Sequence, residues 1–465
     1  MVFSSTVFLF LFLPTLLLLY YLPFAKSRTW RNTILLIFSI GFYAWGEPVF
    51  VFLMLFSIFV NWLIGLKIVE GNRHKKVWMI SAIAFDIVLI GVFKYASFLS
   101  RNLAALAGND KLIIDIALPI GISFFTFQLM SYVFDVYYGS SAAQKNPFYV
   151  ALYISLFPQL IAGPIVRYQQ IENEITDRKE TFSEVSAGMR RFIYGLGKKV
   201  LLANFLAQIA DNVFDYLDNP SVMMAWLGAI AYSLQIYFDF SGYSDMAIGL
   251  GRMFGFHFEE NFNYSFTCDS INDFWRRQHI SLSQWFRDYV YIPLGGSRVS
   301  RGRWVWNMFV VWILTGIWHG ANWTFILWGF YYFLLLLFEK FSNFPNCLSG
   351  KADAVKHIYA LFFTAIGMVM FRASSLTSCF QFIQHMFGIG TSGFIDATFY
   401  TTLKGTWVIL VASMVAATPF LVNSFQKLSR KGYAFIEQVW LLLVFTISIV
   451  EIVSSSYNPF IYFNF

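Results

Sequence analysis

Long apolar runs, separated by short polar segments, make up most of this chain. A helix needs about 20 apolar residues to cross a hydrocarbon core of about 30 Å. Runs close to that length lie near residues 6–25, 32–46, 48–69, 77–99, 112–138, 148–166, 221–256, 304–338, 355–371, 404–424 and 435–454. We therefore expect an all-α polytopic membrane protein with about eleven transmembrane or re-entrant helices. One of the runs 112–138 and 148–166 is expected to be re-entrant, because two full spans would place the charged segment 171–199 outside.

Two segments depart from this pattern of spans. Residues 184–210 carry apolar side chains at helical spacing, with basic side chains on the other side at Arg190, Arg191, Lys198 and Lys199. This pattern predicts an amphipathic helix in the membrane interface. Residues 257–303 form the longest polar stretch and contain six arginines but no lysine. We expect this stretch on the cytoplasmic side, in part re-entrant and shielded by protein.

The composition narrows the class of protein. Hydrophobic residues make up 58% of the chain and charged residues 13%, against about 25% charged residues in a soluble domain, which excludes a soluble fold and a disordered chain. The formal net charge of +7 is spread over short loops, so no nucleic-acid partner is expected. Three distant cysteines without C-x-x-C spacing predict neither a disulfide framework nor a metal site. The chain also lacks P-loop and G-x-S-x-G motifs.

Polar groups interrupt the apolar run 221–256 at Asp239, Ser241, Tyr243 and Asp245. Such groups are expensive at membrane depth and are therefore candidates for function. The pattern indicates that the backbone opens here inside the protein. Two interpretations are equally favoured, a kink with internally satisfied polar groups and the wall of a cavity.

His319 lies near the middle of the run 304–338. If that run is one continuous helix, Thr315, Gly316, Asn322 and Trp323 share the face of His319, and such a face is typical of a narrow polar tunnel. The alternative is a histidine satisfied by a neighbouring helix, with Gly316 and Gly320 as a small-xxx-small packing face. Burial keeps an imidazole neutral, so His319 is a candidate general base toward a hydroxyl or a transient carrier of an acyl group.

His279 lies among arginines and aromatic residues in the polar stretch 257–303. Guanidinium groups bind phosphates through two hydrogen bonds, and the ring of Trp275 can stack on a base. The stretch is therefore a candidate site for a phosphate-bearing donor, and the equally weighted alternative is arginine anchoring at lipid headgroups. The candidate residues of this stretch are His279, Trp275, Arg276, Arg277, Arg287 and Asp288.

Several of these stretches resemble one family. The motifs are MVFSSTVFLFLFLP at the start, LPIGISFFTFQLMSYVFDVY at 118–137, FPQLIAGPIVRY at 157–168, YFDFSGYSDMAIGLGRMFGF at 237–256, FWRRQHISLSQWFRDYVYIPLGGSR at 274–298 and GIWHGANWTFILWG at 316–329. Together they resemble the membrane-bound O-acyltransferase superfamily, in particular its bacterial branch of alginate and peptidoglycan O-acetyltransferase membrane subunits. The chain departs from that branch at Gln278, where an aromatic residue is common.

The resemblance implies a ring of membrane helices around a central funnel, with His319 at the family's near-invariant histidine and His279 at its second polar position. It further implies transfer of an acyl group, commonly acetyl from cytoplasmic acetyl-CoA, to an extracytoplasmic polysaccharide, with no bound cofactor. A separate transferase, similar to SGNH hydrolases, is the expected protein partner. The substrate-binding set then comprises the residues of the polar stretch together with Trp318, Asn322, Trp323, Asp239, Ser241 and Tyr243.

We therefore expect a multi-pass O-acetyltransferase of the cell membrane. Residues 1–465 are predicted to form a single membrane domain, with core motifs in 1–340 and further spanning helices in 355–465. Two alternatives remain open: D-alanyl transfer to teichoic acid from a carrier protein, and a flippase or secondary transporter, for which inverted repeats are the expected sign.

Overall fold

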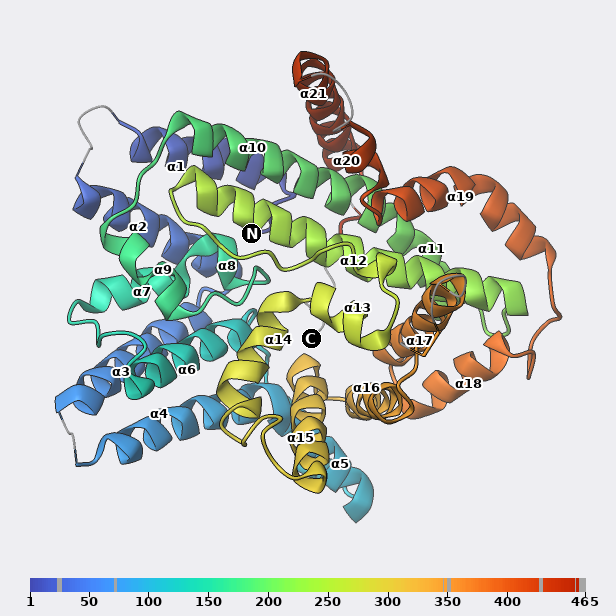
Figure 1. Cartoon of the computed structure of the whole chain (residues 1–465), viewed down its shortest axis with the longest axis horizontal. Coiled ribbons are helices and arrows are strands. Elements are labelled where there is room, and N and C mark those ends of the chain that lie inside the picture. Colours follow the sequence, from blue (N-terminus) through green and yellow to red (C-terminus); the bar gives the residue numbers. More distant parts are fainter. Residues whose placement is uncertain are drawn as a thin grey trace. The chain divides into compact units, whose positions relative to one another are not determined.

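The regular elements of the chain are helices. The computed structural model describes residues 1–22, 27–70, 73–345, 347–348, 353–425, 430–455 and 457–459, and in these ranges it contains no strand (Figure 1). The predicted all-α class is confirmed. Residues 460–465, the end of the predicted C-terminal spanning region, lie outside the described residues.

Six helical stretches among the described residues are long and apolar enough to cross a membrane. They are Phe50–Val69, Lys75–Ala107, Trp323–Ser342, Asp353–Arg372, Ala397–Ala416 and Ala434–Ser454. A polytopic membrane protein is thus confirmed, whereas the count of about eleven helices is not. The run 148–166 is not one span, because it divides into α7 (Pro147–Ser155) and α8 (Phe157–Leu160). Leu156, which separates them, has a non-helical backbone (φ −53°, ψ 110°), and Pro158 in the first turn of α8 has no amide hydrogen with which to continue the hydrogen bonds of α7.

The chain forms two compact units. The first consists of residues 1–192 and 244–259, and the second of residues 193–243 and 260–465. The first unit contains η1 (Phe8–Phe12), α1 (Leu13–Tyr20), α2 (Arg28–Gly46), α3 (Phe50–Glu70), α4 (Lys75–Ile90), η2 (Gly91–Tyr95), α5 (Ala96–Ala107), η3 (Asp110–Leu112), α6 (Ile122–Tyr138), α7, α8 and α9 (Tyr168–Thr176). The helices α10 (Phe182–Gly197) and α12 (Val222–Met253) contribute residues to both units.

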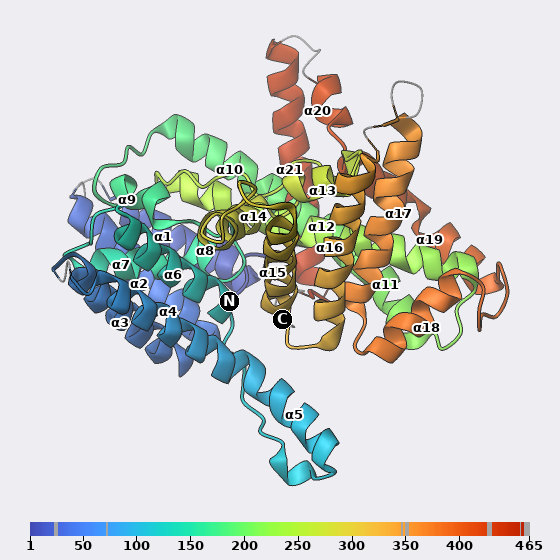
Figure 2. The ribbon, with the colours of Figure 1, turned by 60° about the horizontal axis from the view of Figure 1, so that its bottom comes forward.

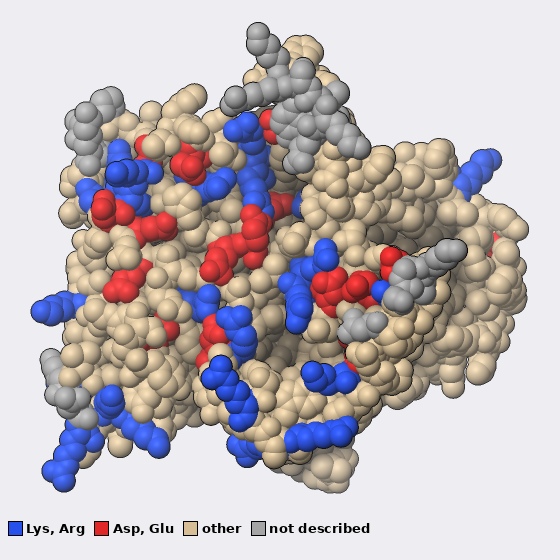
Figure 3. All heavy atoms as spheres, viewed as in Figure 1, with Lys and Arg blue, Asp and Glu red and all other residues tan. Residues whose placement is uncertain are grey.

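In the first unit, α3, α4 and α6 pack against one another. Their interface holds polar groups away from lipid, since the Asn61 amide donates to Asp86 Oδ1 at 3.0 Å. A second polar cluster surrounds Glu180, whose carboxylate forms ion pairs with Arg28 at 2.5 Å and Arg31 at 2.7 Å. Figure 3 shows acidic and basic groups next to one another on the face that it displays, so acidic groups offset part of the basic excess there.

The second unit contains the remaining helices. They are η4 (Lys198–Ala203), α11 (Asn204–Tyr216), η5 (Ser265–Thr267), α13 (Ile271–Arg277), α14 (Ile280–Phe286), η6 (Arg287–Tyr291), α15 (Arg301–His319), α16 (Trp323–Ser342), α17 (Asp353–Arg372), α18 (Leu376–Met386), α19 (Ala397–Ala416), α20 (Phe420–Phe425) and α21 (Arg430–Ser454). Helix α16 packs against both α15 and α17, and Figure 2 shows these three side by side. Helix α13 also packs against α16 and α17.

The backbone does not open at Asp239–Asp245, contrary to the sequence-based prediction. Helix α12 runs without a break from Val222 to Met253. Its small residues serve close packing instead, because a Cβ on Gly242 would lie 2.8 Å from the Gly195 carbonyl oxygen of α10 and 3.0 Å from the Lys199 amide nitrogen. One part of the kink interpretation does hold, because Asp239 has a polar partner inside the protein. Its carboxylate pairs with Lys199 at 2.6 Å.

That ion pair also corrects the prediction for residues 184–210. Lys199 does not lie on a lipid-facing basic surface, since its side chain is 4% exposed. Its ammonium group also donates to the carbonyl oxygen of Pro459. Isolated charges are costly to bury, so the carboxylate of Asp239 explains why a lysine is tolerated there.

Candidate active site

His319 is the last residue of α15, and the chain turns directly after it. Gly320 has an extended backbone (φ −172°, ψ 158°), and Asn322 caps α16 by accepting a hydrogen bond from the Thr324 amide at 3.1 Å. The run 304–338 is therefore two helices joined by a short connection, and the prediction of one continuous helix is wrong. His319 lies at a helix end and is 6% exposed.

The break removes Asn322 and Trp323 from the helical face of His319. The amide of Asn322 donates to the Ser374 carbonyl oxygen at 2.8 Å, which ties the start of α16 to the segment after α17. Trp323 is 50% exposed. Helices α15 and α16 approach closely at Gly316 and Gly329. A Cβ at either position would overlap the backbone of the other helix, so glycine is what permits this approach.

Three aromatic rings lie against the imidazole of His319. The ring centroids of Trp318, Trp328 and Phe371 lie 5.0, 5.0 and 5.1 Å from the imidazole centroid. The planes are inclined at 73°, 81° and 78° to the imidazole, which are edge-to-face arrangements. One ring comes from each of α15, α16 and α17, so the tertiary structure assembles this environment from three helices.

His279 lies in the turn between α13 and α14. Its backbone is left-handed (φ 50°, ψ 52°), a conformation that non-glycine residues adopt infrequently. Asn261 holds the turn, because its carbonyl oxygen accepts from the Ile280 amide at 2.9 Å and its side-chain oxygen accepts from the Ser281 hydroxyl at 2.8 Å. The neighbouring amide of Asn263 donates to the Arg277 carbonyl oxygen at 2.9 Å. These hydrogen bonds hold the backbone of the turn on both sides of His279.

Aromatic rings lie against His279. Its side chain is 5% exposed, and the rings of Phe240 and Phe262 lie 4.9 and 6.3 Å from its own. Burial disfavours the imidazolium and lowers the pKa of His279 to about 3. The imidazole is therefore neutral at physiological pH.

The two histidines predicted from the sequence come together in the second unit. Their ring centroids lie 6.5 Å apart. Trp318 contacts both rings, since its centroid lies 5.9 Å from that of His279. Forty residues of sequence separate the two positions, and only the packing of the α13–α14 turn against the end of α15 brings them together.

Trp275 belongs to the aromatic cluster behind His319 and does not lie on an open arginine surface. Its ring centroid lies 5.3 Å from Trp328, 5.3 Å from Trp312 and 4.9 Å from Tyr332. The carboxylate of Glu339 orients α13, because it accepts from the first backbone amides of that helix, Ile271 at 2.6 Å and Asn272 at 3.0 Å. A negative charge at a helix N-terminus is favourable.

The arginine side chains of the polar stretch 257–303 do not form one common binding surface. Arg277 pairs with Asp273 at 2.9 Å, and Arg287 pairs with the adjacent Asp288 at 2.7 Å. Arg276 is exposed, and the Arg287 side chain is 57% exposed. Two of these guanidinium groups thus have carboxylate partners, and Arg276 and Arg287 face outward.

The remaining predicted residues lie on α12. Asp239, Ser241 and Tyr243 are all buried, and Asp239 pairs with Lys199. These residues form part of the helix packing of the second unit. In the part of the chain that the structure describes, His, Cys, Asp and Glu do not gather in groups of three or more that could hold a metal ion.

Sequence reasoning missed the two rings that complete the surroundings of His319. Trp328 lies nine positions after His319 in the motif GIWHGANWTFILWG, so the resemblance contained a signal for it. Phe371 lies 52 positions after His319 on a different helix, in an ordinary apolar run. Nothing in the local pattern distinguishes Phe371 from the other phenylalanines of the chain.

Comparisons with known proteins agree with this architecture. The model of the MBOAT, membrane-bound O-acyltransferase, family matches residues 141–380. The chain is 39% identical over 490 residues to the probable alginate O-acetylase AlgI of Pseudomonas putida and 38% identical over 525 residues to that of Pseudomonas aeruginosa, with 100% of each chain covered. It is 31% identical over 514 residues to the peptidoglycan O-acetyltransferase of Helicobacter pylori, with 100% of this chain and 98% of that protein covered.

The chain therefore belongs to the membrane-bound O-acyltransferase family. Within that class it is an O-acetyltransferase and a multi-pass membrane protein. The roles of the individual site residues stay predictions, as does the single-domain organisation.

Proposed function

We propose that this O-acetyltransferase takes acetyl from acetyl-CoA on the cytoplasmic side of the cell membrane and passes it outward, for O-acetylation of an extracytoplasmic polysaccharide such as alginate or peptidoglycan. The names of its relatives support the polymer class. The observation that carries the proposal is the pair of buried imidazoles, His319 and His279, 6.5 Å apart at the junction of helices.

The chemistry needs a base in a dry environment. The acceptor hydroxyl gives its proton to the neutral imidazole of His319 while its oxygen bonds to the acetyl carbonyl carbon. The carbon–sulfur bond then breaks, and the thiolate leaves with the proton that the imidazolium returns. The products are the O-acetyl ester and free CoA thiol, and the thioester supplies the driving force. In the second form of the mechanism, the imidazole nitrogen itself accepts the acetyl group and then passes it to the hydroxyl.

The donor lies on the polar stretch 257–303 in this proposal. The outward-facing guanidinium groups of Arg276 and Arg287 meet the phosphates of CoA. Asp288 orients the guanidinium group of Arg287, and Arg277 pairs with Asp273 within α13. His279 of this segment contacts Trp318 beside His319, and in this proposal the two side chains line the path of the acyl group. A separate extracytoplasmic transferase, similar to SGNH hydrolases, completes the transfer to polymer.

The His319→Ala variant tests the base. We expect O-acetylation of the surface polymer to fall by at least about 100-fold, because a positioned general base contributes that much or more. Polymer-bound acetate from cells is the measurement, and the exposed His74 provides a matched control, since His74→Ala removes an equal side chain in a loop. Normal acetylation by a His319→Ala protein expressed at the wild-type level would exclude the role.

Donor and polymer need separate experiments. Membranes supplied with acetyl-labelled acetyl-CoA should transfer label to polymer without ATP, whereas transfer from a D-alanyl carrier protein alone would favour the teichoic-acid alternative. A deletion strain should lose acetate from one surface polymer, which identifies the acceptor. Mass spectrometry of the enzyme after a single turnover distinguishes a base from a carrier. Only a carrier gains about one acetyl group per chain, and an acetyl group that replaces a hydrogen atom adds about 42 Da.

A further inference from the structure

The aromatic rings around His319 leave the imidazole little free space. Trp318, Trp328 and Phe371 each lie with their ring centroid within 5.1 Å of the imidazole centroid. Aromatic centroids at this separation are in van der Waals contact. Trp328 is 1% exposed and Phe371 is 5% exposed.

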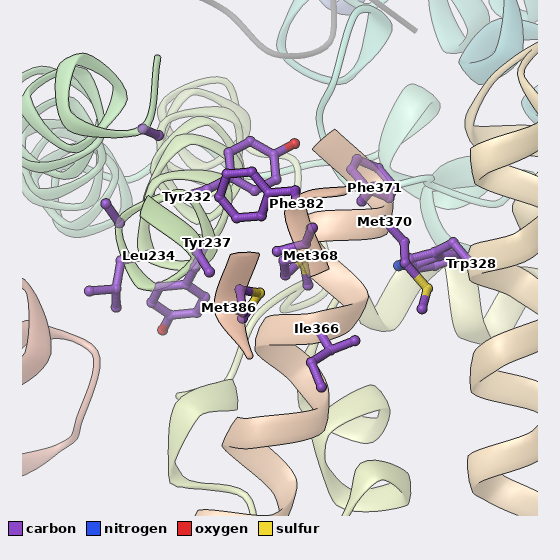
Figure 4. Close-up of a cluster of buried hydrophobic side chains, with 14 of the residues drawn as sticks. Tyr232, Leu234, Tyr237, Trp328, Ile366, Met368, Met370, Phe371, Phe382 and Met386 are labelled. Carbon is purple, nitrogen blue, oxygen red and sulfur yellow. The ribbon is translucent and has the colours of Figure 1, made fainter. Parts of the chain in front are cut away.

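These rings are held by further packing. Phe371 lies 5.4 Å from Trp328 and 5.0 Å from Phe325 between ring centroids, and Figure 4 shows Phe371 and Trp328 beside each other with Met370. Phe325 in turn lies directly against Gly320, since a Cβ at that position would overlap its ring. Trp328 also packs against Tyr332 at 5.1 Å. Neither Trp328 nor Phe371 can therefore swing aside without displacing side chains on α16 and α17.

A reacting acyl group must enter this environment. Reaction requires the carbonyl carbon about 3–3.5 Å from the attacking atom, so the alkyl part of the acyl group must lie beside the rings that contact the imidazole. Packed interiors accommodate extra methylene groups poorly, because neighbouring side chains then leave their preferred rotamers. A methyl group is the smallest alkyl part, and each further methylene must push against Trp328 or Phe371.

We propose that Trp328 and Phe371 limit the transferred acyl group to acetyl, and that they set the acyl-chain specificity of this enzyme. The inference rests on the proposed function, in which the thioester reacts at His319. It assigns to two residues of different helices a role in choosing the donor, separate from the chemical role of His319.

The experiment compares donors of increasing length. Membranes containing the wild-type protein, its extracytoplasmic transferase and the polymer receive acetyl-, propionyl-, butyryl- or hexanoyl-CoA, and acyl groups on the polymer are measured to obtain kcat/KM for each. One methylene in a tight apolar site changes kcat/KM by about 10- to 200-fold. We expect wild type to favour acetyl over butyryl by about 100-fold or more, and Phe371→Ala and Trp328→Phe each to reduce this preference at least tenfold.

Phe382 provides the matched control. It belongs to the same buried cluster (Figure 4) and is 9% exposed, but its ring stacks on Phe214 at 4.1 Å and not on His319. Phe382→Ala removes the same atoms and a similar amount of packing, so we expect its donor preference to equal that of wild type. A ratio of two kcat/KM values is unaffected by the amount of folded enzyme, so partial misfolding of a variant does not imitate the effect.

The outcomes separate this inference from the proposed function. If wild type transfers acetyl and butyryl equally well, or if both Phe371→Ala and Trp328→Phe keep the wild-type preference, the inference is wrong while the function stands. A wild-type protein that transfers no acyl group from any CoA thioester overturns the proposed donor and the inference with it. An equal shift in Phe382→Ala would show that general loosening, not these two rings, sets the preference.

Discussion

His279 occupies a position where an imidazole does not readily take up a proton from water. An exposed histidine titrates near pH 6.5, but desolvation by burial lowers the pKa of His279 to about 3. The rings of Phe240, Phe262 and Trp318 lie against His279. A neutral imidazole beside an acyl donor can accept the proton of a hydroxyl, whereas a permanently charged group at the same place would be costly to bury.

The burial of His279 predicts a dependence of folding stability on pH. In the unfolded chain His279 binds a proton near pH 6.5, but in the folded protein only near pH 3. Between these values the unfolded state holds more protons, so the stability contributed by the neutral form is complete above pH 6.5 and is lost as the pH falls. The loss amounts to about 2 kcal/mol at pH 5.

Thermal unfolding of the detergent-purified protein between pH 8 and pH 5 measures this effect against His279→Gln, which has no titrating group. Wild type should lose stability relative to the variant on acidification. An unchanged gap between the two unfolding midpoints at pH 8 and pH 5 would contradict the neutral, buried state of His279.

At the scale of elements, the site depends on how closely helices meet. Helices α15 and α16 approach at Gly316 and Gly329, where a side chain would overlap the backbone of the opposite helix. The turn at Gly320 then places His319 at the end of α15, beside Trp328 of α16. Small residues allow such close approach between membrane helices, where van der Waals packing replaces the hydrophobic effect as the driving force.

Gly316→Ala tests this contact. The new methyl group would overlap the Phe325 carbonyl oxygen, so we expect α15 and α16 to separate, with a loss of stability of about 1–3 kcal/mol and reduced activity. Gly302→Ala is the matched control on the same helix, because nothing lies within 4 Å of its added Cβ. That variant should be as stable as wild type or more so, since alanine favours a helix over glycine. Equal unfolding midpoints for the two variants would exclude the close contact.

The exposed surface of the spanning helices is suited to contact with lipid. Large apolar side chains are exposed on its spanning helices, for example Trp407 at 56%, Leu442 at 66% and Val453 at 68%. In water such surfaces would aggregate, but in a bilayer they face the acyl chains of lipid. Polar groups within the units are paired instead, as Asn61 with Asp86 and Lys199 with Asp239.

The three cysteines report on the folded state of the whole chain. Cys347 is exposed, while Cys268 and Cys379 are buried, and burial raises their thiol pKa to about 12 and about 11. Because the thiolate is the reactive form, a maleimide should modify only Cys347 in the native protein and all three cysteines after denaturation. Mass spectrometry of labelled peptides measures this, with Cys347→Ser as the control that gains no native label. Native labelling at Cys268 or Cys379 would contradict the packing of the second unit.

The class of the protein and the importance of two histidines follow from the order of residues alone. Hydropathy can be evaluated from neighbouring residues along the chain. Hydrophobic residues make up 58% of this chain and lie in long runs, and such runs predict a helical membrane protein. His319 and His279 were predicted because a polar residue is conspicuous among apolar or arginine-rich neighbours. The local pattern did not reveal the end of α15 at His319, because Gly320, Ala321 and Asn322 can also continue an apolar helical run.

Which side chains meet in the site depends on how the helices pack. The tertiary structure placed Lys199 against Asp239, Phe371 against His319, and the two imidazoles 6.5 Å apart. These partners come from different helices, and their encounter depends on how whole helices pack, through contacts such as Gly316 on Phe325 and Glu339 on the first amides of α13. Helix formation is set by neighbours along the chain, whereas the environment of a buried side chain is set by neighbours in space, and so the aromatic surroundings of His319 became visible only in the folded protein.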